Sequence, residues 1–248
     1  MSELSGLHRW RPDTGSEIRK TARALLIEHG VQGVTLRAIA RALGITAPAL
    51  YRYYRSHSDL IEQVRADICG DLAGELTADI AAQPSDDVIA QFFAACRGFR
   101  RWALAHPREF TLVFAFRANA DSGAAGDAAL TTLDTATEPF GRVFISSAAR
   151  LLAAHAITLP PDDLVPPELH GDISAFRDAL LVLLAEAEAP IDADRLNLGM
   201  AYLMLQYWTR IYGHVALEVF GNFPIPVSKP DALFDSVLDG IAREVGLV

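Results

Sequence analysis

Cysteine is scarce in this chain, which contains only Cys69 and Cys96 among its 248 residues. Two cysteines cannot form the disulfide framework of a small secreted domain, so we expect a reducing compartment. The N-terminus lacks the apolar core of a signal peptide. The strongest hydrophobic run, residues 179–185, is too short to span a bilayer. These absences predict a cytoplasmic protein without a membrane partner.

The sequence also lacks the motifs of common catalytic and metal sites. It contains no GxxxxGK[ST] phosphate loop, no GxSxG turn and no paired His/Cys spacing that would hold a metal ion. Its carboxylates fall mostly at helix starts and on solvated faces. We therefore expect no catalytic residue, no metal and no cofactor, and keep an all-helical enzyme or a protein-binding adaptor as alternatives.

Positive charge is in short supply, since 22 Lys+Arg face 31 Asp+Glu and the net charge is −9. Binding to DNA requires positive charge near the phosphates. The first 65 residues supply it, because they hold ten Lys+Arg against six Asp+Glu, whereas the remainder carries a net charge of −13. A basic head on an acidic body is typical of a DNA-reading segment attached to another domain, and it argues against the adaptor.

Helical periodicity runs through the chain, and no segment shows convincing strand alternation. An all-α fold is therefore expected. Outside the segment 35–54 discussed next, the expected helices cover about residues 16–30, 57–82, 86–106, 107–116, 127–154, 173–187, 192–220 and 230–245. Residues 1–11 precede them and are either a disordered tail or an arm whose arginines reach DNA.

Residues 35–54, TLRAIARALGITAPALYRYY, have the pattern of a helix-turn-helix. The first helix has one apolar face, formed by Leu36, Ile39, Ala40 and Leu43. Gly44 lies at the sharp turn, where glycine adopts positive φ without steric cost. Thr35 and Thr46 are placed to cap the two helices, and Pro48 falls in the first turn of the second. In a helix-turn-helix this second helix lies in the DNA major groove.

The helix expected at about residues 192–220 has a long apolar stripe. Its members are Leu198, Tyr202, Leu205, Trp208 and Tyr212, followed by Leu217 and Phe220. This is more apolar surface than a single exposed helix should show. Pairing of the stripe with a second copy would give a two-fold dimer, with its recognition helices about 34–36 Å apart.

The chain resembles the tetracycline-repressor (TetR) family of bacterial transcription regulators. The resemblance covers residues 18–60, where a first helix ending in EHG is followed by GVTLRAIARALGITAPALYRYYRSHSDL. Residues 207–214 are also similar to a TetR subgroup with a WHG-type C-terminal domain, although the order of His and Gly differs.

The resemblance implies a fold with two domains. Residues 1–56 would form an N-terminal arm and a three-helix DNA-binding domain, and residues 57–248 a helical ligand-binding and dimerisation domain. The chain would act as a homodimeric repressor on a palindromic operator and be released by a small-molecule, largely apolar inducer. The helix at about 57–82 would transmit the effect of the inducer.

The motif and the resemblance together define candidate DNA-binding residues: Thr35, Arg37, Thr46, Ala47, Pro48, Tyr51, Arg52, Tyr53 and His57. Members of the family usually carry a lysine where this chain has His57. Because a histidine is only partly charged at neutral pH, we expect a weaker or pH-dependent phosphate contact there.

Aromatic residues concentrate in the middle of the chain, and such a stripe is more often core than pocket. Four residues are chosen as candidates for ligand binding: Phe99, Trp102, Phe114 and Tyr207. Tryptophan and tyrosine combine apolar area with a polar group, which suits a ligand cavity.

Overall fold

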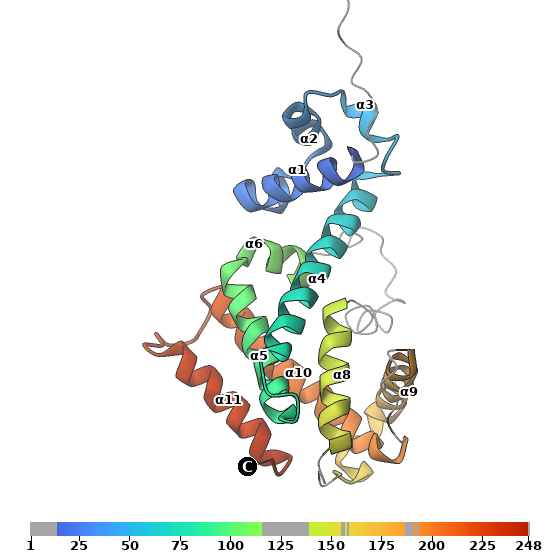
Figure 1. Ribbon diagram of the computed structural model, residues 1–248, viewed down its shortest axis with the longest axis vertical. Coiled ribbons are helices and arrows are strands. Elements are labelled where there is room, and N and C mark those ends of the chain that lie inside the picture. The colour runs from blue at the N-terminus through green and yellow to red at the C-terminus, as the bar shows by residue number, and fades with distance from the viewer. Residues whose placement is uncertain are drawn as a thin grey trace, which may run out of the picture. The chain divides into compact units, whose positions relative to one another are not determined.

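The computed structural model describes residues 14–115, 139–154, 157, 159–186, 191 and 193–247. These residues form only helices and connecting turns, so the all-α prediction is confirmed (Figure 1). The helices are α1 Thr14–His29, α2 Leu36–Leu43, α3 Ala47–Leu50, α4 His57–Ala81, α5 Val88–Ala105, α6 Pro107–Phe110, α8 Pro139–Ala154, α9 His170–Glu186, α10 Leu198–Val219 and α11 Pro230–Glu244. A π-helical turn, Thr111–Ala115, follows α6. The N-terminal arm and part of the helix expected at 127–154 lie outside the described residues.

The chain forms two compact units. The first comprises the described parts of residues 1–68 and 108–122, and the second those of 69–107 and 123–248. Helix α4 begins in the first unit and ends in the second. The boundary predicted between residues 56 and 57 lies at the start of α4, whereas the two units divide within that helix, after Ile68.

The core of the first unit is formed by the apolar faces of α1 to α4. The stripe expected on α1 is buried at Ile18, Ala22 and Leu26. The other fully buried side chains of this unit include Ile39, Leu50, Leu60 and Ile68. Side chains cap the start of α4, since Ser56 Oγ accepts from the Asp59 N–H at 3.0 Å and Asp59 Oδ2 accepts from the Arg55 N–H at 2.8 Å.

Helix α6 also packs in the first unit. Phe110 is fully buried, and Glu109 on the same helix is 1% exposed. The Arg23 guanidinium on α1 donates to Glu109 Oε1 at 2.5 Å. Because a buried carboxylate needs a partner of opposite charge, this ion pair fixes α6 against α1.

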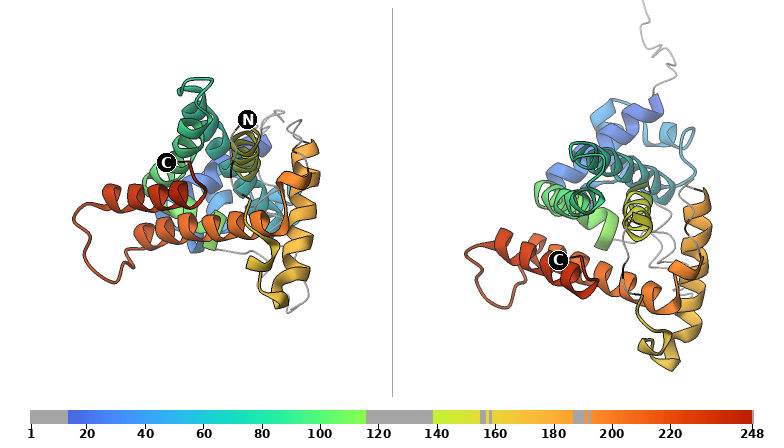
Figure 2. Two further views of the ribbon diagram at one scale, coloured as in Figure 1. Left: turned by 90° about the horizontal axis from the view of Figure 1, so that it is seen from below. Right: turned by 60° about the horizontal axis from the view of Figure 1, so that its bottom comes forward.

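The second unit contains the end of α4 together with α5, α8, α9, α10 and α11. Helices α10 and α11 lie side by side and are joined by a loop at one end (Figure 2). Three ion pairs tie these helices together: Arg210 to Glu244 at 2.6 Å, and Arg100 of α5 to both Glu218 and Asp231 at 2.7 Å. None of the helices that the structure describes is sufficiently long and apolar to cross a membrane.

Candidate functional site

The turn between α2 and α3 has the geometry that its sequence predicts. The Thr35 hydroxyl accepts from the Ala38 N–H at 3.1 Å and so caps α2. Gly44 adopts the left-handed conformation, with φ 67° and ψ 26°. The N–H groups of Gly44 and Ile45 then donate to the carbonyls of Arg41 and Ala40, which closes the end of α2.

Helix α3 is shorter than the sequence predicts. The second helix of the motif was expected to continue to Tyr54, but the α-helix covers Ala47–Leu50 and a turn follows. The Arg52 N–H donates to Ala49 and the Tyr53 N–H to Leu50, both across three residues, which tightens the backbone into a turn. Thr46 occupies the N-cap, but its side chain makes no capping hydrogen bond.

Tyr54 anchors this turn to α1. Its side chain is 3% exposed, and its hydroxyl donates to the Gly15 carbonyl at 2.7 Å. The Arg19 guanidinium donates to the same hydroxyl oxygen at 3.3 Å. Because Tyr54 points inward, Tyr51 and Arg52 are left exposed and Tyr53 is half-buried.

The DNA-binding candidates collect at the surface of α2, α3 and the start of α4. Six of them are exposed outright besides Arg52: Thr35, Arg37, Thr46, Pro48, Tyr51 and His57. Ala47 is half-buried, like Tyr53. The Nε2 atom of His57 lies 2.6 Å from the Val34 carbonyl oxygen, so this ring nitrogen donates to the backbone just before α2.

Ion pairing divides the arginines of the first unit into two groups. Arg19 pairs with Asp67, Arg23 with Glu109 and Arg65 with Glu62, so the arginines of α1 and α4 are neutralised. The arginines of α2 and of the turn after α3 are Arg37, Arg41 and Arg52, and all are exposed. These three make no ion pair with any part of the chain that the structure describes. They leave unneutralised positive charge on the helix-turn-helix surface.

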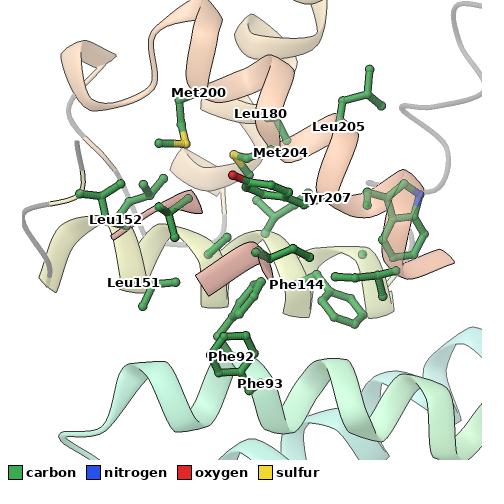
Figure 3. Close-up of a pocket in the computed structure, with 18 of the residues that line it drawn as sticks. Phe92, Phe93, Phe144, Leu151, Leu152, Leu180, Met200, Met204, Leu205 and Tyr207 are labelled. Atoms are coloured by element: carbon green, nitrogen blue, oxygen red, sulfur yellow. The ribbon is translucent and has the colours of Figure 1, made fainter. Parts of the chain in front are cut away.

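The second unit contains a partly open cavity of about 360 Å³ (Figure 3). The volume is at the lower end of the range of roughly 300–1,000 Å³ that is typical of small-molecule pockets. Its lining comes from α5, α8, α9, α10 and α11 and includes Phe92, Phe93, Phe140, Phe144, Ile145, Leu151, Leu152, Leu180, Met200, Met204, Leu205, Tyr207, Trp208 and Val245. No Asp, Glu, Lys, Arg or His is among the described residues that line it.

The four ligand-binding candidates lie in different surroundings. Tyr207 lines the cavity. Phe99 is fully buried behind the lining, with its ring centroid 5.9 Å from Phe144 and 5.7 Å from Trp208. Trp102 is core as well and stacks on the His106 ring. Phe114 belongs to the first unit and packs on Phe110, and it is not among the described residues that line the cavity.

Sequence reasoning missed most of the lining. Helix α8 contributes a whole face, from Phe140 to Leu152, and α10 contributes Met200 and Met204. The apolar spacing of α8 predicts a buried face, but it does not distinguish a face against other helices from a face on an empty space.

The dimerisation candidates on α10 have neighbours within their own chain. Leu198, Tyr202 and Leu205 pack against a small core of Val165, Ile173 and Ala201. Trp208 lines the cavity and stacks on Tyr212. The excess of apolar surface that suggested pairing is therefore partly covered inside the protomer.

The Tyr207 hydroxyl is buried and has no hydrogen-bond partner among the described residues. Burial, with a further contribution from the nearby Glu244 carboxylate, raises the pKa of Tyr207 to about 12. The hydroxyl therefore stays protonated at physiological pH. It is the main polar side-chain group that the cavity offers to a ligand.

Comparison with known proteins relates both units to one family. The model described as "Bacterial regulatory proteins, tetR family" matches residues 18–64, and the model described as "Tetracyclin repressor-like, C-terminal domain" matches residues 92–241. The HTH-type transcriptional regulators Rv1816 of Mycobacterium tuberculosis and Mb1846 of Mycobacterium bovis are each 29% identical over 236 residues, which cover 91% of this chain and 89% of the relative.

Two solved structures have a similar fold. The regulatory protein SCO4313 matches with a TM-score of 0.59 and 21% identity, over 96% of this chain and 100% of that one. A protein of unknown function from Rhodococcus sp. RHA1 matches with a TM-score of 0.54 and 17% identity, over 98% and 99% of the two chains. The matched family models cover the helix-turn-helix and most of the second unit. The chain therefore belongs to the tetR family of bacterial regulatory proteins, and it is a DNA-binding transcriptional regulator rather than an enzyme.

Proposed function

We propose that the protein is a repressor that binds a palindromic operator as a homodimer and releases it when a small molecule occupies the cavity. The observation that carries the DNA-binding part is the group of exposed arginines on the helix-turn-helix, Arg37, Arg41 and Arg52, which no carboxylate of the described chain neutralises. Cations without an ion-pair partner attract phosphates, whereas the charge of paired cations is largely neutralised within the protein.

A gel shift with DNA from upstream of the protein's own gene tests this part. Arg52→Ala and Tyr53→Ala are expected to abolish specific binding while the variants remain folded by circular dichroism. Arg150→Ala is the matched control, because Arg150 is an exposed arginine of α8 in the second unit. Retained operator affinity in Arg52→Ala, or an equal loss in Arg150→Ala, would count against the proposal.

The dimer part is supported by exposed apolar side chains at one end of the α10–α11 pair. They are Leu217 and Phe220 near the end of α10, Ile225 in the loop and Leu233 in the first turn of α11. Several exposed apolar side chains in one region of a protein surface are typical of a protein–protein interface. Those parts of the Leu198–Tyr212 stripe that are not covered within the protomer would extend this interface.

Sedimentation measures the oligomeric state directly. Leu217→Glu is expected to shift the protein from dimer toward monomer, because a charge would be buried at the interface. Leu104→Glu places the same charge at a similarly exposed leucine of α5 and is expected to leave the dimer intact. A monomeric wild-type protein, or two variants that behave alike, would contradict this assignment.

The cavity supports the ligand part of the proposal. A ligand shifts the protein away from DNA only if it binds the DNA-free conformation more tightly than the bound one. Because α4 passes from the first unit into the second, its tilt is the proposed link between the cavity and the recognition helices.

A further inference from the structure

The cavity lining has a chemical character that restricts what can occupy it. Among the described lining residues the side chains are hydrocarbon, aromatic or thioether groups, and their only polar side-chain groups are the Tyr207 hydroxyl and the Trp208 indole N–H. A charged group placed there would lose its hydration and find no opposite charge in the lining, which strongly disfavours binding. The lining therefore favours a neutral occupant.

Tyr207 adds a directional requirement. Its ring points into the cavity, and its hydroxyl has no hydrogen-bond partner in the described chain (Figure 3). The nearby Glu244 carboxylate raises the pKa of this hydroxyl, and Arg210 donates two bonds of 2.6 and 2.8 Å to the same carboxylate. A buried hydroxyl without a partner is unfavourable, and a ligand oxygen that accepts its proton removes that penalty.

Methionine gives the cavity some tolerance of shape. Met200 and Met204 line it from neighbouring turns of α10. Their unbranched, flexible side chains can repack around ligands of different outline. Recognition by this lining therefore depends more on polarity than on a single molecular shape.

We propose that the cavity binds a neutral, mostly hydrocarbon molecule bearing one oxygen atom, a hydroxyl or a carbonyl, which hydrogen-bonds to Tyr207. This inference rests on the proposed function only for its biological consequence. The binding itself is a property of the second unit and can be measured without DNA.

Three molecules of equal chain length separate the possibilities: 1-decanol, decanoate and decylammonium, each competing at pH 7.5 with a neutral fluorescent naphthylamine dye bound to the full-length protein. We expect 1-decanol to displace the dye at a concentration at least about tenfold lower than either ion, since neither charge finds a partner in the cavity. Equal or stronger binding of decanoate or decylammonium would overturn the proposal, and so would no displacement by 1-decanol.

Variants locate the site and the hydrogen bond. Tyr207→Phe is expected to weaken the binding of 1-decanol about fivefold and to leave the affinity for the dye unchanged, because only the alcohol hydrogen-bonds to the Tyr207 hydroxyl. Tyr202→Phe removes a hydroxyl from a half-buried tyrosine of the same helix outside the lining and should change neither affinity. Ala148→Phe fills the cavity and should abolish the binding of both 1-decanol and the dye. Unchanged 1-decanol affinity in Tyr207→Phe would refute the assigned contact.

Failure of this inference is distinguishable from failure of the proposed function. If 1-decanol binds as described and DNA is not released in a gel shift with any bound molecule, the regulatory proposal fails and the ligand class stands. If DNA is released by a charged molecule that requires the same cavity, as judged by Ala148→Phe, the ligand class fails and the regulatory proposal stands.

Discussion

His57 illustrates how the contacts of one side chain restrict what it can offer to DNA. Its Nε2 atom donates to the Val34 carbonyl oxygen at 2.6 Å, so the proton of the neutral ring resides there. The Nδ1 atom then carries only a lone pair, and it can donate to a phosphate only when the ring is protonated. A lysine at this position would be charged at every physiological pH.

His57→Lys is therefore expected to raise operator affinity by about fivefold at pH 8, equivalent to ~1 kcal/mol for an exposed contact. Fluorescence anisotropy with labelled operator measures both proteins. Equal operator affinities of the wild type and His57→Lys would contradict this role.

His214 is the residue whose titration should affect stability. It is 8% exposed, packs against the rings of Phe223 and Phe234, and its Nε2 atom lies 3.8 Å from Glu218. Burial lowers the pKa of His214 below its ordinary 6.5, and the Arg100 guanidinium adds to this effect while Glu218 opposes it.

The folded protein thus binds a proton at His214 less readily than the unfolded chain does. The contribution to stability is present above pH 6.5 and is lost as the pH falls below it. When the pH is lowered from 8 to 5.5, the urea concentration at the midpoint of unfolding should fall less for His214→Gln than for the wild type. Identical losses in the two proteins would show that other groups account for the acid sensitivity.

At the scale of elements, turn and capping chemistry predicted the helix-turn-helix well. Thr35 and Gly44 have the predicted conformations because a cap and a positive φ are decided by a few neighbouring atoms. The length of α3 could not be predicted in this way. The turn after Leu50 is set by Tyr54, whose hydroxyl reaches Gly15 at the other end of the unit's sequence.

The apolar face of α10 shows the limit of helical periodicity. The spacing identifies which residues face away from water, but not whether they meet the same chain, a second copy or a ligand. Leu205 and Trp208 were predicted to pair with a second copy, and in the structure both line the cavity. Tyr207 and Trp102 were chosen for the same combination of apolar area and a polar group, and Tyr207 lines the cavity whereas Trp102 is buried in the core.

Gly44 and Gly70 allow backbone conformation to be tested with the same substitution. An added Cβ meets no atom within 4 Å at either position, but Gly44 has a φ of 67° and Gly70 lies in the exposed interior of α4. Gly44→Ala should destabilise the protein by about 1–2 kcal/mol, and Gly70→Ala should stabilise it by about 0.5–1 kcal/mol. Chemical denaturation checks both, and shifts of equal sign would contradict the assignment.

Helix α6 directly follows α5 in the sequence. Because α5 carries the cavity-lining residues Phe92 and Phe93, this junction is a second place, besides α4, where the chain passes between the two units. The anchor of α6 is the Arg23–Glu109 pair. Arg23→Leu should destabilise the protein by about 1–3 kcal/mol, since Glu109 is left buried without its cation. Adding Glu109→Gln should restore at least part of that loss. Strict additivity in this double-mutant cycle would show that the two residues do not act as a pair.

At the scale of the whole molecule, the distribution of charge reconciles an acidic protein with DNA binding. The net charge of −9 would repel DNA if it were spread evenly. The sequence predicts the basic first unit, but only the structure separates its paired arginines from Arg37, Arg41 and Arg52. Binding should therefore weaken steeply with salt, and each of these arginines that contacts a phosphate should reduce the slope by about one when it is removed.

Selection of bound DNA from a random pool by the purified protein tests the central claim most directly. The account predicts enrichment of an inverted repeat whose half-sites are centred about 10 base pairs, or a small multiple of that spacing, apart. The Arg52→Ala protein should enrich nothing under the same conditions. A pool without any enriched sequence, or the same sequence recovered with Arg52→Ala, would contradict the account.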